Sequence, residues 1–255
     1  MKKNINIILL LIAGWLVSCK KDATTGMDEM KDKAKVVFIN VTPNAASVAV
    51  QASREIAIYP FYNGVQFNNF PIKFPFSNGY KAFNPGTLTI RLDTAQSQAN
   101  NPPGVAAKVT EFGYTVEADS YYSLYSIGTT QAVDTFFVKD DVSFPTAGKA
   151  KVMFLNLSTD AGPIDIVDDI TGLVVAANIS YKQRSGYIEI APATFRWRIN
   201  VAGTNTVLRA PRDLIIDANS VYTVWARGLR VIPAPGTTLG NHVLQLSYHA
   251  NRWTY

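Results

Sequence analysis

The sequence has little of what enzymes and metal sites need: one cysteine, Cys19, and two histidines, His242 and His249, among 255 residues. A single cysteine excludes an intramolecular disulfide. Two histidines without further ligands do not supply a structural zinc site, and neither is accompanied by a recognisable nucleophile and orienting acid. We therefore expect no catalytic site and no cofactor. Both histidines fall near a predicted last strand, where we expect them at the surface or at a sheet edge.

Other signatures of chemistry are missing as well. The formal net charge is +5, but the lysines and arginines are scattered, so no basic cluster predicts a nucleic-acid partner. The chain has no glycine-rich phosphate loop after a strand and no Gly-x-Ser-x-Gly turn. These absences favour a binding or structural protein over an enzyme.

The first nineteen residues predict export. A basic start at Lys2 and Lys3 is followed by an apolar run from Ile7 to Ala13, which is shorter than the roughly 20 residues that span a bilayer. This pattern is typical of a secretory signal. The sequence at 16–19, Leu-Val-Ser-Cys, resembles the lipobox of bacterial lipoproteins. That resemblance implies a signal peptide over 1–18, cleavage before Cys19, and lipidation of Cys19.

The predicted lipid determines where the protein is expected. Two or more acyl chains anchor a protein stably to a membrane without spanning it, and no second run of 18 apolar residues follows the signal. Residues 19–33 are polar and predict a flexible tether. Their Lys21-Asp22 pair resembles the start of the export signal of surface lipoproteins in Bacteroidetes-type bacteria. We expect an outer-membrane lipoprotein, on either the periplasmic or the surface-exposed face.

The remainder of the chain contains a duplication. Three segments recur in the same order: 33–40 as 149–156, 79–87 as 186–194, and 118–128 as 218–228. The first copy is longer, with insertions inside 51–79 and 93–111. A Pro/Gly break at 145–148 predicts the boundary between a first domain, 34–145, and a second domain, 149–255.

The composition and periodicity of both copies predict an all-β fold. Aromatic and β-branched residues are plentiful, and turn residues recur about every ten positions. Alternation is clear at Leu88, Ile90 and Leu92 in the first copy, as expected for a half-buried strand. We predict one β-sandwich per copy. Tyr122 and Tyr222 resemble the tyrosine that closes a corner in Greek-key sandwiches.

Each copy has a Val/Phe-rich opening strand, a tyrosine before a Pro-Gly or Pro-Ala turn, an alternating strand, and a Ser-x-Tyr-Ser/Thr strand that ends in glycine. This order resembles the DUF4397 family of exported bacterial proteins, most clearly over 149–230. The resemblance implies tandem Ig-like sandwiches and no defined activity.

An aromatic stretch in the first copy is a candidate binding surface. Tyr59, Phe61 and Tyr62 precede an Asn-Gly turn, and further rings follow over 67–76. Exposed rings would suit sugars or partner proteins. The alternative, which we favour, is that these rings plug the first sandwich or pack between the domains.

Two further candidates occupy matching positions in the copies, Tyr125 and Trp225. Alternation places them on the strand face opposite Tyr122 and Tyr222. They are therefore either exposed ligand contacts or residues of an interface between the domains.

An acidic group, Asp160, Asp165, Asp168 and Asp169, is a weaker candidate. Oxygen-rich loops bind calcium, but this spacing matches no known calcium loop and the first copy lacks the carboxylates. We expect no metal site.

These observations predict a lipid-anchored, non-catalytic binding or scaffolding protein whose partner is a glycan or an envelope protein. The alternatives are an adhesin or assembly subunit, which would show an unpaired strand edge, and a glycan hydrolase, which would need two converging carboxylates.

Overall fold

The computed structural model describes residues 30–43, 57–66, 68–94, 107–129, 132–231 and 242–252. These residues form strands, turns and bends, with no helix among them; accordingly, no described segment is a helix able to cross a bilayer. The all-β prediction is confirmed. The predicted signal peptide, Cys19 and most of the predicted tether lie outside the described residues.

The first half of the chain forms two β-sheets, of four and five strands, that face each other. One sheet has the order β5-β1-β8-β9, and the other has the order β3-β2-β6-β7 with β4 also pairing β2. The strands are β1 (Ala34–Asn40), β2 (Ala57–Tyr62), β3 (Val65–Gln66), β4 (Ile72–Lys73), β5 (Ser77–Phe83), β6 (Gly86–Thr94), β7 (Ala107–Val116), β8 (Tyr121–Thr129) and β9 (Ala132–Asp140).

The second half repeats this arrangement. One sheet has the order β13-β10-β17-β18, with β14 also pairing β10, and the other has the order β12-β11-β15-β16. The strands are β10 (Ala150–Asn156), β11 (Ile164–Asp168), β12 (Val174–Ile179), β13 (Gln183–Arg184), β14 (Ile188–Ile190), β15 (Ala193–Val201), β16 (Val207–Ile216), β17 (Val221–Arg227) and β18 (Gln245–Arg252).

The duplicated segments occupy equivalent places in the two halves. The segment at 33–40 becomes β1 and pairs in parallel with β8, while its repeat becomes β10 and pairs in parallel with β17. The strands recorded in the described residues pair only within 34–140 or within 150–252, and 141–149 contains no strand. The domain limits at 145 and 149 stay a prediction, with which this pairing agrees.

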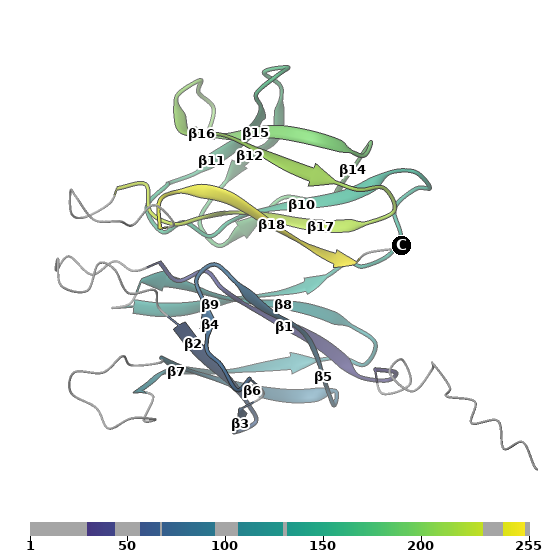
Figure 1. Ribbon diagram of the computed structural model, residues 1–255, viewed down its shortest axis with the longest axis vertical. Helices are drawn as coiled ribbons and strands as arrows, with labels where there is room; N and C mark the ends of the chain where they lie inside the picture. The colour runs from purple at the N-terminus through teal and green to yellow at the C-terminus, as the bar shows by residue number, and fades with distance from the viewer. Residues whose placement is uncertain are drawn as a thin grey trace, which may run out of the picture.

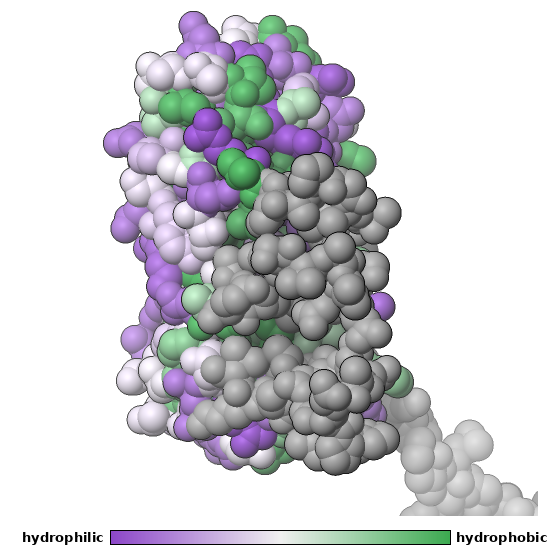
Figure 2. Space-filling model, turned by 90° about the vertical axis from the view of Figure 1, so that its left-hand side faces the viewer, coloured by the Kyte–Doolittle hydropathy of each residue, from purple (hydrophilic) through white to green (hydrophobic). Residues whose placement is uncertain are grey.

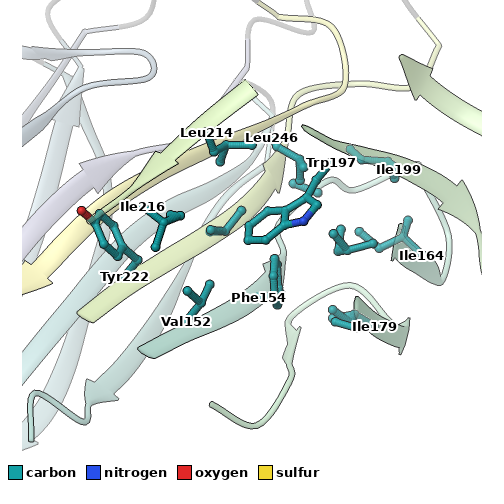
Figure 3. Close-up of a cluster of buried hydrophobic side chains, with 14 of the residues drawn as sticks. Val152, Phe154, Ile164, Ile179, Trp197, Ile199, Leu214, Ile216, Tyr222 and Leu246 are labelled. Atoms are coloured by element: carbon teal, nitrogen blue, oxygen red, sulfur yellow. The ribbon is translucent and has the colours of Figure 1, made fainter. Parts of the chain in front are cut away.

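The four sheets are stacked on one another along the long axis of the molecule (Figure 1). An apolar cluster fills the space inside each half. In the second half it includes Phe154, Trp197 and Tyr222, which converge from both sheets (Figure 3). The first half has its own cluster, with Phe38 and Ile90 on facing sheets. Each pair of sheets is therefore a sandwich with its own core.

A third apolar cluster lies between the two sandwiches. It joins β1, β8 and β9 to β10 and β17, with one residue that follows β1 and one that follows β10: Val37, Ile39, Val41, Tyr125, Ile127, Val138, Met153, Leu155, Leu157 and Trp225. The inner sheets are thus covered on both faces, and every residue of β1, β10 and β17 is buried. This explains why the centres of β1 and β10, residues 36–39 and 152–155, are apolar on both faces instead of alternating.

The two sandwiches meet through equivalent faces. Tyr125 contacts its counterpart Trp225, with ring centroids 5.7 Å apart. Tyr80 of the first half accepts a hydrogen bond from Asn251 at 3.3 Å, and its counterpart Tyr187 accepts one from the backbone N–H of Asp141 at 3.2 Å. Such reciprocal contacts are those of an isologous interface between two copies of one subunit, here joined within one chain.

The tyrosines at the start of β8 and β17 make the corner expected from the sequence. The hydroxyl of Tyr122 accepts a hydrogen bond from the backbone N–H of Glu117 at 3.0 Å, and Tyr222 accepts one from Asp217 at 3.2 Å. Both bonds reach back five residues and fix the turn before the strand.

Candidate binding site between the sandwiches

The aromatic residues of β2 do not share one surface. Tyr62 is 1% exposed and belongs to the core of the first sandwich, where its ring lies 4.6 Å from Phe83. Tyr59 and Phe61 are half-buried and alternate with the inward residues of the strand. The guanidinium of Arg91 lies 4.1 Å from the Phe61 ring. Only Tyr59 and Phe61 therefore remain as surface contacts on β2.

The later rings of this stretch are divided between interface and surface. Phe74 is fully buried; it stacks on His242 of the second half at 4.8 Å, and the Arg227 guanidinium lies 4.9 Å from its ring centroid. Phe70 and Phe76 are 79% and 61% exposed. Phe67 lies outside the described residues. One ring of the stretch thus packs between the halves, as in the favoured alternative.

Tyr125 and Trp225 come together in the layer between the sandwiches. They are 0% and 3% exposed and meet edge to face. The structure therefore places both rings in the interface and not on an outer surface, with only one side of Trp225 reaching a cavity described below.

The expectation of surface histidines is wrong for His242, which is 5% exposed beneath Phe74. His249 lies on the edge strand β18, as expected, but its ring turns toward the interface, 5.1 Å from Trp225. Burial lowers the pKa of His249 to about 4, so the ring is neutral at pH 7. The sequence could not reveal this burial, because a separate sandwich covers both rings.

The acidic group of the second half serves local structure. Asp165 accepts backbone N–H bonds from Asn178 and Gly203 at 2.7 and 2.8 Å. Asp168 accepts bonds from the turn that follows it, and Asp169 pairs with Arg198 at 2.6 Å. These carboxylates are directed to different partners, and no cluster of three metal-ligating side chains occurs in the described part of the chain.

A buried polar network crosses the interface. The Asp140 carboxylate accepts hydrogen bonds from Ser123 at 2.8 Å and Tyr80 at 3.0 Å. Asn251, the counterpart of Asp140 on β18, donates to Tyr80 and to Ser123 at 3.3 and 3.4 Å. Burial raises the pKa of Asp140 to about 6, although the donated hydrogen bonds oppose the shift. No sequence pattern indicates this carboxylate, because the network joins side chains of four strands, β5, β8, β9 and β18.

A cavity of about 220 Å³ opens at one side of the same interface. It lies between the start of β5 in the first half and β18 in the second, and Arg212 of β16 borders it. Its lining combines rings, hydroxyls and one guanidinium: Ile39, Pro75, Phe76, Ser77, Arg212, Trp225, Ser247, Tyr248 and His249. A second hollow of about 640 Å³ shares Tyr248 and His249 and extends to Ile215, Asp217, Tyr222 and Ala250.

The opposite side of the interface shows why this cavity is open. In the strand ladders, Ser247 pairs with Trp225, whereas Phe136 pairs with the matching Tyr125. Ser77 likewise pairs with Ile39, whereas Arg184 pairs with the matching Leu155. Two serines thus stand where the other side has Phe136 and Arg184, and the smaller side chains leave space.

On the coloured part of the face shown in Figure 2, apolar residues form small separate patches among polar ones. Scattered apolar residues are normal on a soluble surface and do not by themselves mark a docking site. The cavity between the sandwiches is therefore the best-defined candidate site in the described residues.

The fold and the site define a tandem β-sandwich protein with an interface cavity. The chain belongs to the family described as Domain of unknown function (DUF4397), whose model matches residues 34–167. The match covers the first half and continues into β11, while the resemblance in the sequence looked clearest in the second half.

Two solved structures are similar over most of their length. Both are crystal structures of proteins with a provisional description as cell adhesion proteins. The protein from Bacteroides eggerthii DSM 20697 shares 10% identity, with 88% of this chain and 97% of that chain covered and a TM-score of 0.21. The protein from Bacteroides fragilis NCTC 9343 shares 11% identity, with 88% and 99% covered and a TM-score of 0.19. A search of curated proteins finds no match.

Proposed function

We propose that this protein is a lipid-anchored, non-catalytic module of the cell envelope, in which two sandwiches act as one rigid binding or scaffolding unit. The observation that supports this most is the apolar layer between the sandwiches. Interfaces between independent domains are usually more polar and permit relative motion. Here the interface is an apolar core with a buried hydrogen-bond network, which favours a fixed arrangement.

The acidic residues support a binding role over a hydrolytic one. A glycoside hydrolase needs two carboxylates facing each other about 5–10 Å apart across the substrate. Among the described residues, no Asp or Glu lines the smaller cavity, and only Asp217 lines the larger hollow. Asp217 is itself engaged with the Tyr222 hydroxyl at 3.2 Å.

The strand edges bear on the adhesin alternative. Assembly by strand addition needs a long, unprotected edge. In the second half, β16 carries Pro211, and Arg212 donates to the Leu246 carbonyl of β18 at 2.8 Å. In the first half, β7 and β9 are edge strands of ten and nine residues without proline. The first sandwich therefore has the longer proline-free edge strands, since β12 and β18 of the second sandwich have six and eight residues.

The anchor and its face are tested by protease treatment of intact cells that carry the parent protein or its Cys19→Ala variant. We expect the parent to fractionate with membranes and the variant to be released. Cleavage of the parent on intact cells would place it at the surface, and resistance would place it in the periplasm. Membrane association of the Cys19→Ala variant equal to that of the parent would contradict the proposed lipid anchor.

A glycan contact at Tyr59 and Phe61 is a narrower form of this proposal. These are the two candidate rings on the outer face of β2. Paired Tyr59→Ala and Phe61→Ala variants should lose binding on a glycan array, while a Tyr62→Phe control keeps the buried ring and the binding. Unchanged array binding in both alanine variants would reject the contact.

A further inference from the structure

The side chains that line the cavity between β5 and β18 are basic, polar and uncharged, or apolar, and none is acidic. We infer that this cavity binds a small organic anion, in which a carboxylate is attached to a single six-membered ring. This inference rests on the proposed binding role, but it concerns the purified chain in solution and does not depend on the membrane anchor.

The charge around the cavity is positive. Arg212 borders it and uses Nη1 for the Leu246 carbonyl, at 2.8 Å, and for Gln245, at 3.4 Å. A guanidinium has five N–H donors, so others remain for a ligand. Arg227 lies behind Ser247 and donates to its hydroxyl at 2.5 Å. No acidic residue is among those lining the cavity.

The second guanidinium remains charged despite its burial. Burial, together with the nearby charge of Arg212, lowers the pKa of Arg227 to about 10, which is still well above neutral pH. The charge of Arg212 in the lining, with that of Arg227 behind Ser247, makes the potential in the cavity positive and favours an anion.

The other polar groups of the lining can donate hydrogen bonds: the hydroxyls of Ser77, Ser247 and Tyr248, the indole of Trp225 and the imidazole of His249. The Asn251 amide nitrogen lies 3.0 Å from Nε2 of His249. Nε1 of Trp225 and Nδ1 of His249 are enclosed in this structure and have no hydrogen-bond partner among the described residues. Because the lining holds donors and no carboxylate, it suits a ligand rich in acceptors, such as a carboxylate.

The apolar part of the lining determines the rest of the ligand. Phe76, Trp225 and Tyr248 present rings, and Ile39 and Pro75 complete the wall. Phe76 is 61% exposed at the rim, where a flat ligand can stack on it. The cavity volume of about 220 Å³ lies below the roughly 300–1,000 Å³ of sites for drug-sized ligands. This space suits one ring with its acidic group.

The pseudo-symmetric side of the interface provides the control. There Phe112 takes the place of Arg212, since these residues pair with the matching Ile90 and Trp197. Phe136 takes the place of Ser247. The same fold therefore accommodates a phenylalanine at the Ser247 position, which makes Ser247→Phe a variant that fills the cavity with a side chain already tolerated by the repeat.

The test is a titration of the full chain with benzoate and glucuronate, each compared with its neutral relative, benzyl alcohol or glucose. The indole N–H resonance of Trp225, assigned with a Trp225→Phe variant, reports binding. We expect at least one acid to bind about tenfold or more tightly than its neutral relative, since hydrogen bonds to charged groups are the stronger ones. Which acid binds distinguishes an aromatic acid from an acidic sugar.

Four variants test whether the ligand binds in the cavity. Ser247→Phe should abolish it, Ser247→Ala should change the affinity by less than about threefold, and Arg212→Gln should remove the preference for the acid. Thermal unfolding verifies that Ser247→Phe is folded, and Ser77→Arg, which copies Arg184, fills the cavity from the other wall. The inference is overturned if neither acid binds below about 10 mM, if the neutral relatives bind equally, or if folded filled variants bind like the parent.

Discussion

In the first sandwich, Phe137 of β9 stacks between Tyr114 and Tyr122, with ring centroids 4.2 and 5.0 Å away. In the second, the corresponding Tyr248 of β18 lies 6.0 Å from Tyr222, and a hollow of about 640 Å³ lies beside them. Leu214 stands where the first half has Tyr114, since each pairs across its ladder with a matching residue. The same framework is closed by three stacked rings in one copy and left open in the other.

This difference indicates which positions of the duplication were constrained. The residues inside each sandwich and in the layer between them remain apolar in both copies. The divergence falls at the open side and at the rim of the interface, where Arg212 and Ser247 stand in place of Phe112 and Phe136. Of the residues that line the cavity, Ile39 and Trp225 are the buried members of an apolar cluster, so a binding site can develop at the rim with little loss of core packing.

Trp225→Ala would break the shared interface most strongly. Removal of a buried tryptophan leaves a cavity and costs about 3–5 kcal/mol in the free energy of unfolding. Denaturation of the full chain, followed by circular dichroism, measures this loss. Tyr125→Ala is the matched variant and should cost a similar amount, because both rings belong to one cluster. A loss below about 1 kcal/mol for both would argue against a packed interface.

Gly128, near the end of β8, and Gly228, directly after β17, should respond alike to substitution. A Cβ on Gly128 would lie 2.1 Å from the Ala132 carbonyl oxygen, and a Cβ on Gly228 would lie 2.3 Å from that of Val243. Both have positive φ, 88° and 86°, so Gly128→Ala and Gly228→Ala combine backbone strain with a clash. We expect each to lower the unfolding free energy by about 3 kcal/mol. A loss in only one half would show that the repeat is not equivalent at this turn.

The stability of the protein should depend on pH through Asp140, and the uncharged Asn251 of the same network provides the comparison. The pKa of Asp140 rises from 3.8 to about 6 on folding. The ionised carboxylate therefore destabilises the folded protein. This destabilisation is absent below pH 3.8 and develops as the pH rises to 6. Asp140→Asn should therefore stabilise the protein at pH 8, by up to about 3 kcal/mol at 1.36 kcal/mol per pKa unit. The gain should vanish near pH 4, as denaturant titrations at both pH values would show.

The reciprocal variant provides the control for this network. Asn251→Asp places a second carboxylate beside Tyr80 and Ser123 and should destabilise the protein at pH 8, because like charges would share one buried site. His249 acts in the opposite direction to Asp140, since its lowered pKa makes stability fall as the pH drops from 6.5 toward 4. A gain from Asp140→Asn that is independent of pH would reject the buried-charge explanation.

The smallest expected effect concerns Phe137 and Tyr248, at the side that is closed in the first sandwich and open in the second. Phe137→Ala removes a ring that stacks on two others, so it should cost about 1–2 kcal/mol more than Tyr248→Ala, which removes one tilted contact. Parallel denaturation curves of the two variants measure the difference. Equal losses would mean that the first sandwich is not closed more tightly than the second.

Some features of the molecule follow from local patterns and were predictable. The alternation at Leu88, Ile90 and Leu92 places these side chains in the first core, because side chains of a strand alternate between its faces. The repeated segments became equivalent strands, and the tyrosine corners formed at Tyr122 and Tyr222. These outcomes depend on residues close in sequence or on repetition of a pattern.

The candidate site was predicted only in part. Trp225 was recognised from its matching position, but Arg212, Ser247 and His249 were not connected with it. Tyr62 was grouped with Tyr59 and Phe61, although it lies in the core. The cavity depends on which sheet faces which, and sequence periodicity identifies the two faces of a strand without identifying what covers each.

The sequence by itself determined the strand content, the duplication and the family, because each depends on local composition and repeated order. It also carries the prediction of a lipid on Cys19. The tertiary structure alone decided that the two sandwiches pack through equivalent faces, that His242 and Asp140 are buried, and that a cavity opens at one side of the interface. The physical reason is that burial of a side chain depends on the surface that covers it, and here that surface comes from the other copy, about a hundred residues away in the chain.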